Sequence, residues 1–416
     1  MNLTPSPFAP SEFPKLPAVG GVQAATASRG FYAGRGLERD DVFLFQFAPG
    51  TTCAGVFTSS STASADVQWC RDALKNGAGH GAALVVNSGN SNAFTGPKGA
   101  LKNEATLAAM VAALSVDKDQ CFLAATGVIG EPLDDANYVG SIVPKLASEL
   151  IEPDWEACAR AFMTTDTFPK GAGFVRKIDG VPTTFSGIAK GSGMIAPNMA
   201  TMLAYVFTDA AIAPDLLDAA LREACAQSFN AITVDSDTST SDSLMVFATG
   251  ANGAAIIETD ADPRFAAFTS ALNEICLELA LQIVKDGEGA SKFITIAVEG
   301  AASQESARTI AADIANSPLV KTALAANDAN WGRVVMATGK SGEPIDQNHL
   351  SIWFDEVQVA EYGARADDYD EALATVAVSK PEISIRVRVG DGPGNSLIYT
   401  CDLTHAYVDI NGAYRT

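Results

Sequence analysis

Residues 201–207 read Thr-Met-Leu-Ala-Tyr-Val-Phe, a run without charge that follows a loop-like segment of glycine, proline and asparagine at 190–200. The run has the length of a strand and lacks the polar alternation of a half-exposed one, so it predicts a strand buried on both faces. A strand of this kind lies inside a layered protein, with other elements packed against it. The rest of the chain has to supply those layers.

Strand-like and helix-like segments alternate along the chain. Asp179-Gly180 predicts a two-residue hairpin turn, because such a turn needs positive φ angles that these residues tolerate. Asp262-Pro263 predicts the start of a helix, and Gly287 follows its end. The mixture indicates an α/β or α+β protein in two lobes. The other predicted elements are strands at 82–86, 121–125, 174–178, 181–188, 383–389 and 397–401, and a helix with apolar positions at 107, 110, 111 and 114.

The charge of the chain excludes several classes of partner. Its 49 acidic and 28 basic side chains give a net charge of −21, which disfavours binding to nucleic acid or anionic membranes. No apolar run approaches the roughly 20 residues of a membrane-spanning helix, and residues 1–15 lack the pattern of a signal peptide. The seven cysteines have no CxxC spacing, which predicts free thiols in a reducing compartment. We therefore expect a cytoplasmic protein without nucleic-acid or membrane partners.

Histidine is too scarce to suggest the usual catalytic sites. His80, His349 and His405 lie far apart and in no metal-ligand spacing, so we predict no metal site. Residues 191–196 match G-x-G-x-x-A, but Pro197 follows at once and prevents the helix that a dinucleotide site requires. We predict no bound cofactor. An enzymatic base has to come from another kind of group.

Thr201 stands at the mouth of the predicted buried strand, where a rigid strand follows a loop that can be strained. Attack of its Oγ on the carbonyl of Ala200 would give an ester, and hydrolysis of that ester would free a chain beginning at Thr201. The new α-amine, whose ordinary pKa is about 7.7–8.0, is then a base carried by the nucleophile itself. Composition by itself favours the alternative, in which Thr201 is only a β-branched strand residue.

Segment 190–203, Lys-Gly-Ser-Gly-Met-Ile-Ala-Pro-Asn-Met-Ala-Thr-Met-Leu, resembles the self-processing signature of the ornithine acetyltransferase family of arginine biosynthesis. The resemblance extends over nearly the whole chain. It implies an α/β sandwich with an N-terminal threonine nucleophile, and cleavage between Ala200 and Thr201 into an α chain (1–200, the N-terminal lobe) and a β chain (201–416, the C-terminal lobe). Further segments that resemble family motifs, in family order, are 54–58, 86–90, 125–130, 163–167, 328–333 and 414–416.

The resemblance also implies residue roles. Thr201 would take the acetyl group, and Thr126 and Gly127 would form the oxyanion hole, for which a glycine that allows close backbone approach is suited. Lys190 could bind a carboxylate as a point charge, and Glu288 could bind an ammonium group. Sequence does not separate Thr164 from its neighbour Thr165 as a substrate contact. The positions that would bind substrate are Thr164, Lys190, Thr201, Glu288, Asn411 and the C-terminal Thr416.

The implied reaction transfers an acetyl group from N-acetylornithine to glutamate through an acetyl-threonine, giving ornithine and N-acetylglutamate. Acetyl-CoA could be a second donor, and the implied assembly is a heterotetramer of two α and two β chains. One alternative is a threonine amidohydrolase or aminopeptidase that passes the acyl group to water. Another is an uncleaved, inactive relative that acts as a binding protein.

Overall fold

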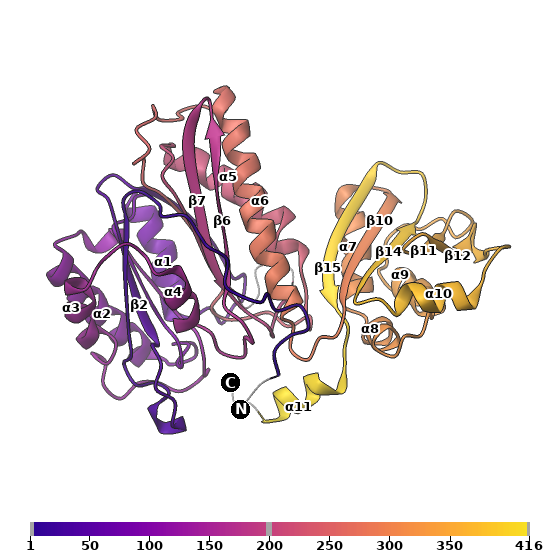
Figure 1. Ribbon diagram of the computed structural model, residues 1–416, viewed down its shortest axis with the longest axis horizontal. Helices are drawn as coiled ribbons and strands as arrows, with labels where there is room; N and C mark the ends of the chain where they lie inside the picture. Colours follow the sequence, from indigo (N-terminus) through magenta and orange to yellow (C-terminus); the bar gives the residue numbers. More distant parts are fainter. Residues whose placement is uncertain (1–3, 197–201, 414–416) are drawn as a thin grey trace.

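Two sheets pack face to face in the first lobe of the computed structural model, which describes residues 4–196 and 202–413 (Figure 1). The first sheet has the order β1-β2-β4-β5 and the second the order β3-β9-β8-β7-β6. Neighbouring strands are antiparallel except for β4 with β5 and β8 with β9. The strands are β1 (Val22–Ala27), β2 (Val42–Phe47), β3 (Thr52–Phe57), β4 (Ala83–Asn87), β5 (Cys121–Ala125), β6 (Lys170–Ile178), β7 (Val181–Lys190), β8 (Leu203–Thr208) and β9 (Ser243–Ala248).

Aromatic side chains fill the space between these two sheets. Phe47 of β2 stacks on Phe247 of β9 with ring centroids 4.2 Å apart, and Phe45 lies against Phe207 of β8 at 4.6 Å. Alternate residues of β8, such as Val206, face the opposite way into a core with α5 and α6, while α2 and α3 cover the outer face of the first sheet. The result is a four-layer sandwich. Its helices are α1 (Ala65–Asn76), α2 (Pro97–Leu114), α3 (Val143–Ser148), α4 (Trp155–Ala161), α5 (Pro214–Gln227) and α6 (Pro263–Lys285), with short 3-10 turns at Ala33–Arg35, Lys118–Gln120, Gly140–Ile142 and Phe229–Ala231.

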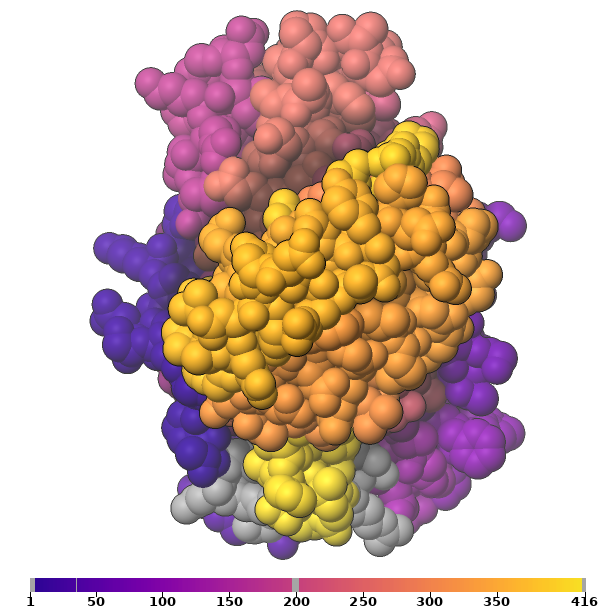
Figure 2. All heavy atoms as spheres, turned by 90° about the vertical axis from the view of Figure 1, so that its right-hand side faces the viewer, coloured from indigo at the N-terminus to yellow at the C-terminus, as the bar shows by residue number. Residues whose placement is uncertain are grey.

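A second lobe follows α6 and has its own core. Its sheet has the order β13-β12-β11-β14-β10-β15 and is covered by helices (Figure 1). Figure 2 shows this lobe in front of the sandwich, with the yellow helix α11 below it. The elements are β10 (Phe293–Ala301), β11 (Ser351–Phe354), β12 (Val357–Glu361), β13 (Ala364–Arg365), β14 (Glu382–Arg388), β15 (Gly394–Cys401), α7 (Gln304–Ala315), α8 (Pro318–Ala325), α9 (Trp331–Gly339), α10 (Glu371–Val378) and α11 (His405–Ala413).

The structure confirms the mixed α/β class, the two lobes and the predicted elements. Asp179 and Gly180 have φ angles of 49° and 79°, as the hairpin between β6 and β7 requires. Asp262 caps α6 by accepting a hydrogen bond from the Arg264 N–H. Helix α2 begins at Pro97, earlier than its apolar positions indicate, because polar side chains such as Lys102 occupy the buried face of its first half.

The predicted chain division at 200/201 does not coincide with the boundary between the lobes. Strands β7 and β8, on either side of it, pair within one sheet, with Lys190 opposite Leu203. The lobes divide instead between the end of α6 at Lys285 and the start of β10 at Phe293. Describing 1–200 and 201–416 as N- and C-terminal lobes was therefore wrong, because the buried strand that follows the division completes the sheet that precedes it.

Helix α6 is the one helix of the described ranges that is long and apolar enough to cross a membrane, with a mean hydropathy of 1.3 over its most apolar window. Its apolar face, which includes Phe268, Leu272 and Leu279, is buried in the core behind the second sheet. All seven cysteines are buried and free, as predicted.

Candidate active site

One end of the sandwich gathers loops from both sheets. In the second sheet, β7 ends where β8 and β9 begin, because Lys190 is paired with Leu203 and Leu203 with Ser243. In the first sheet, the parallel strands β4 and β5 both end here, with Asn87 opposite Ala125. Polar residues that follow or precede these buried strands are thereby brought together from distant parts of the sequence.

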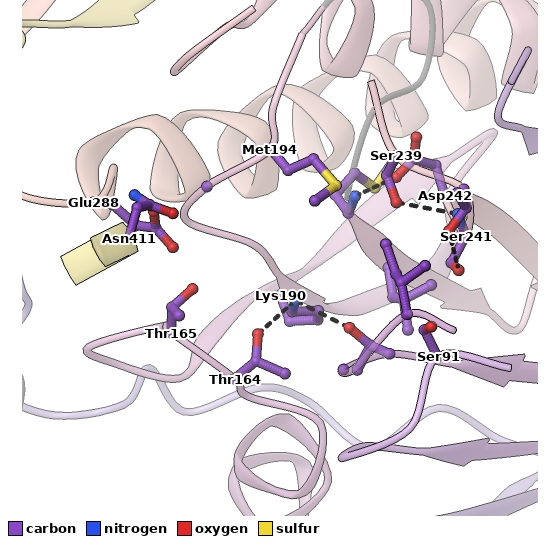
Figure 3. A pocket seen from close by; sticks show the side chains of 17 residues that line it. Ser91, Thr164, Thr165, Lys190, Met194, Ser239, Ser241, Asp242, Glu288 and Asn411 are labelled. Carbon is purple, nitrogen blue, oxygen red and sulfur yellow. Dashed lines mark hydrogen bonds between the residues drawn. The ribbon is translucent and has the colours of Figure 1, made fainter. Parts of the chain in front are cut away.

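The gathered loops enclose a pocket of about 670 Å³, including the solvent at its mouth. Figure 3 shows Lys190 at its centre, Glu288 and Asn411 on one side, and Ser239, Ser241 and Asp242 on the other. The lining residues are Ser91, Thr126, Gly127, Ile129, Thr164, Thr165, Lys190, Gly193, Met194, Met202, Leu203, Ser239, Thr240, Ser241, Asp242, Glu288 and Asn411.

Lys190 supplies a buried positive charge in this pocket; its exposed fraction is 3%. Its Nζ donates hydrogen bonds to the Oγ1 atoms of Thr164 at 2.9 Å and Thr126 at 3.3 Å. Burial lowers the pKa of Lys190 below its ordinary value, against the opposing influence of the nearby Asp166 carboxylate. Its side-chain partners are thus neutral hydroxyls, which leaves the ammonium group suited to bind a carboxylate of a small molecule.

Thr126 and Gly127 present two hydrogen-bond donors to the pocket. The Thr126 N–H already donates to the Asn87 carbonyl oxygen at 3.0 Å, whereas its hydroxyl accepts from Lys190 and keeps its own proton for another acceptor. The Gly127 N–H donates to no residue of the ranges 4–196 and 202–413. Gly127 has a φ of 127°, and a Cβ there would lie 2.5 Å from the Gly89 carbonyl carbon, so glycine is required. This is a suitable geometry for an oxyanion hole.

Glu288 supplies the negative charge of the site. It follows α6, is held by a hydrogen bond from its N–H to the Ser192 carbonyl oxygen (2.9 Å), and accepts from Asn411 Nδ2 at 2.6 Å. Burial raises the pKa of this carboxyl above its ordinary value. A Cβ at position 193 would lie 2.4 Å from Glu288 Cδ, so the loop approaches this side chain as closely as it does only because residue 193 is glycine.

Asp166 fixes the backbone around Lys190. Its Oδ1 accepts from the Gly191 N–H at 2.7 Å and from Lys170 Nζ at 2.7 Å, and its Oδ2 accepts from the Thr164 N–H at 3.0 Å. Burial would raise the pKa of Asp166, but Lys170, Lys190 and the Gly191 N–H together hold it well below its ordinary value. Asp166 is therefore a buried, charged anchor for two segments of the pocket wall.

Comparison with known proteins identifies the family. The model of the ArgJ family matches residues 24–416. The chain is 52% identical over 421 residues to the arginine biosynthesis bifunctional protein ArgJ of Bradyrhizobium diazoefficiens, and 50% identical over 419 residues to that of Rhizobium meliloti; each alignment covers 100% of both chains. The chain belongs to the ArgJ family.

A solved structure of the arginine biosynthesis bifunctional protein from Bacillus halodurans is 38% identical to this ArgJ family member. It covers 50% of this chain and 96% of its own, with a TM-score of 0.48. The family assignment, which rests on the sequence matches, confirms the resemblance drawn from residues 190–203.

The pocket brings together six of the residues that the family resemblance implied, and the other three are not among the described residues. Thr126, Gly127, Thr164, Lys190, Glu288 and Asn411 all line it. Ala200, Thr201 and Thr416 fall outside the described residues, although Met202, the neighbour of Thr201, lines the pocket. Thr164 bonds to Lys190, whereas the Thr165 hydroxyl lies 2.7 Å from that of Ser192, so both threonines remain candidate substrate contacts.

Sequence reasoning missed one wall of the pocket. Ser239, Ser241 and Asp242 lie on the loop that leads into β9, and Ser91 follows β4. The available signal was a polar run at 235–243 directly before the apolar strand 244–248, because a parallel neighbour of β8 would begin at the same sheet edge. Within the described ranges no group of three or more His, Cys, Asp or Glu side chains is arranged to hold a metal ion.

Proposed function

We propose that this ArgJ family member transfers an acetyl group from N-acetylornithine to glutamate, with Thr201 as the acetyl carrier. The observation that supports this most directly is the pocket with a buried ammonium group, Lys190, and a buried carboxyl, Glu288, on separate walls. Both substrates carry at least one carboxylate and one ammonium group. Lys190 can therefore bind a carboxylate of each substrate in turn, whereas Glu288 can bind the side-chain ammonium group of N-acetylornithine and leaves the single amine of glutamate free to attack.

In the first half-reaction, Lys190 binds the carboxylate of N-acetylornithine and Glu288 its side-chain ammonium group. The α-amine of Thr201 accepts the Oγ proton while Oγ attacks the acetyl carbonyl carbon. The Thr126 hydroxyl and the Gly127 N–H donate to the oxyanion. The C–N bond then breaks, the α-amine returns its proton to the departing nitrogen, and ornithine leaves an acetyl ester on Thr201.

In the second half-reaction, glutamate takes the place of ornithine. Its uncharged α-amine attacks the ester carbonyl carbon, the C–O bond breaks, and one proton of the attacking nitrogen passes through the Thr201 α-amine to Thr201 Oγ. The relatives carry the word bifunctional in their names, which supports a second activity. We assign this activity to acetylation of glutamate from acetyl-CoA, with no bound cofactor.

The active enzyme, in this proposal, arises by self-cleavage between Ala200 and Thr201 into chains of 200 and 216 residues. Two copies of each chain form a heterotetramer in the cytoplasm. Transfer to water, the reaction of an amidohydrolase, remains the competing function. Lys190 could bind a carboxylate of the acceptor glutamate in the second half-reaction. This favours transfer to glutamate, because a water molecule that accepts the acyl group needs no charged side chain to bind it.

The test compares ornithine release from N-acetylornithine with and without glutamate, and N-acetylglutamate formation from acetyl-CoA. We expect release to depend on glutamate, because water competes poorly with the bound amine. Equal release without glutamate would instead establish the hydrolase. Thr201→Ala is the control: it should remain a single uncleaved chain without turnover, and Thr201→Ser should retain part of both activities.

A further inference from the structure

The uncleaved chain lacks the base on which the mature enzyme relies. Before cleavage, the nitrogen of Thr201 belongs to the peptide bond with Ala200, and resonance with the carbonyl removes its basicity. The Thr201 hydroxyl nevertheless has to lose a proton when it attacks the Ala200 carbonyl carbon. If self-cleavage occurs as proposed above, another group has to accept that proton.

Asp242 is hydrogen-bonded to Met202, the residue that follows Thr201 in the chain. Its side chain is fully buried and lines the pocket, and its Oδ1 accepts a hydrogen bond of 2.8 Å from the Met202 N–H. Met202 N is bonded covalently to the carbonyl carbon of Thr201. The hydrogen bond therefore holds the carboxylate beside the peptide unit that follows the scissile bond.

The second oxygen of Asp242 is available. Asp242 Oδ2 is buried and has no hydrogen-bond partner among residues 4–196 and 202–413. The charged group that faces this carboxylate is Lys190, and the hydroxyls of Thr58 and Ser239 also lie near it. Burying a carboxylate oxygen without a hydrogen-bond partner destabilises the folded protein. The presence of such an oxygen in the pocket therefore indicates that it has a chemical role or binds a further partner.

The other carboxylates near the pocket are already occupied. Asp166 accepts from two backbone N–H groups and Lys170, which fixes it as an anchor for the loop. Glu288 accepts from Asn411 and lies across the pocket from Asp242 (Figure 3). Among the carboxylates of the described pocket wall, Asp242 alone contacts the backbone next to Thr201.

We propose that the Asp242 carboxylate is the proton acceptor of the self-cleavage step. It takes the proton of Thr201 Oγ as the bond from Oγ to the Ala200 carbonyl carbon forms. It then gives this proton to the Thr201 nitrogen as the Ala200–Thr201 C–N bond breaks, which leaves an ester and a free α-amine. Water hydrolyses the ester, giving the Ala200 carboxylate and restoring the Thr201 hydroxyl. Burial raises the pKa of Asp242 above its ordinary value, which makes the carboxylate a stronger base.

The test follows the conversion of freshly translated chains by denaturing gel and intact mass. Asp242→Asn keeps the shape of the side chain and an oxygen for the Met202 N–H, but removes the base. We expect cleavage to slow about 100-fold or more, the usual range for a lost general base. Asp242→Glu, which restores a carboxylate one methylene longer, should cleave measurably faster than Asp242→Asn. Asp237→Asn removes an exposed carboxylate from the same loop and should cleave at the natural rate.

Each result decides one question. Cleavage of Asp242→Asn at the natural rate, or a folded Asp242→Glu that is no faster than Asp242→Asn, would overturn the role of Asp242. A natural chain that never cleaves, or Thr201→Ala that does, would instead contradict self-cleavage at Thr201 itself. Should Asp242→Asn fail to fold, the natural chain still decides, because its cleavage rate should fall as pH decreases across the range in which the protein stays folded and Asp242 becomes protonated, at a higher pH than an ordinary aspartate. A rate that is constant over that range would refute the proposal.

Discussion

At the scale of single residues, the charges inside the pocket differ from the net charge of the whole protein. The chain has a net charge of −21, which does not attract anionic glutamate. The ammonium group of Lys190 is nevertheless buried at the centre of the pocket, where it donates hydrogen bonds to two hydroxyls. The carboxyl group of Glu288 lies close against Gly193. The substrate recognition that we propose thus rests on two buried charges, whose positions depend on the loop between them.

Glu288→Gln tests the negative member of this pair. Removing the charge should raise the KM for N-acetylornithine roughly tenfold or more, since hydrogen bonds to charged groups contribute about 1.5–3 kcal/mol. Because burial raises the pKa of Glu288, the natural enzyme should begin to lose this affinity as pH falls, at a higher pH than an exposed glutamate would show. Steady-state kinetics against pH measures both effects.

Glu258→Gln, which removes an exposed carboxylate outside the pocket, is the control and should leave KM unchanged. A Glu288→Gln enzyme with natural KM and the natural pH profile would show that Glu288 does not bind the ammonium group.

At the scale of elements, local signals predicted those parts of the fold that local chemistry determines. The hairpin of β6 and β7 follows from Asp179-Gly180, and the start of α6 follows from Asp262-Pro263. The sequence of the first half of α2 has no large apolar residues at helical spacing. The reason is that Lys102, on the buried face, forms an ion pair with Asp66 at 2.9 Å instead of packing against apolar neighbours. Tertiary ion pairing of this kind leaves no periodic trace in a sequence.

From the sequence, only those residues of the candidate site that lie within a recognisable motif could be predicted. Thr126, Gly127 and Lys190 lie within segments that resemble family motifs, whereas Asp242 lies in a polar run without period or recognised spacing. Its position follows from the parallel pairing of β8 with β9, which sets Ser243 opposite Leu203. Strand partners that are distant in sequence are chosen by the packing of whole layers, so sequence alone could not place Asp242 beside Met202.

The contact between β6, α6 and the pocket loop depends on a buried ion network. Lys170 of β6 donates to Asp166 at 2.7 Å and to Asp286, the residue after α6, at 2.6 Å. Asp166→Asn should destabilise the protein by about 3–5 kcal/mol, because it removes one partner of a buried pair. The pKa of Asp166 is lowered in the folded state, so this stability is present above the ordinary aspartate range and is lost as pH falls through the lowered pKa.

Denaturant unfolding of the uncleaved Thr201→Ala chain, with and without Asp166→Asn, measures this difference without interference from cleavage. The matched control lies on the same two elements: Arg176 of β6 pairs with Glu274 of α6 at the surface, and Glu274→Gln should change the unfolding free energy by less than about 1 kcal/mol. Equal effects of the two substitutions would contradict a special role for the buried network.

At the scale of the whole molecule, the proposed cleavage would cut the chain in the middle of the second sheet. Strands β3, β6 and β7 precede the cut, and β8 and β9 follow it, yet the order in space is β3-β9-β8-β7-β6. The residues after the cut therefore lie at the centre of a sheet whose edges come from before it. The same interleaving carries Asn411, on α11 beyond the second lobe, back to Glu288 and the pocket.

The cleaved chains should consequently remain one folded body. Both junctions between the two chains, β7 with β8 and β9 with β3, are full ladders of six residue pairs, and β8 is buried on both faces. Separation would expose this core, so an affinity tag on the chain 1–200 should retain the chain 201–416 in native buffer and release it only in about 6 M guanidinium chloride. Thr201→Ala, which keeps the backbone intact, should be retained as one chain in both conditions. Release of the second chain in native buffer would mean that the ladders and the shared core do not hold the two products together, and that the active pocket, with walls from both, could not persist after cleavage.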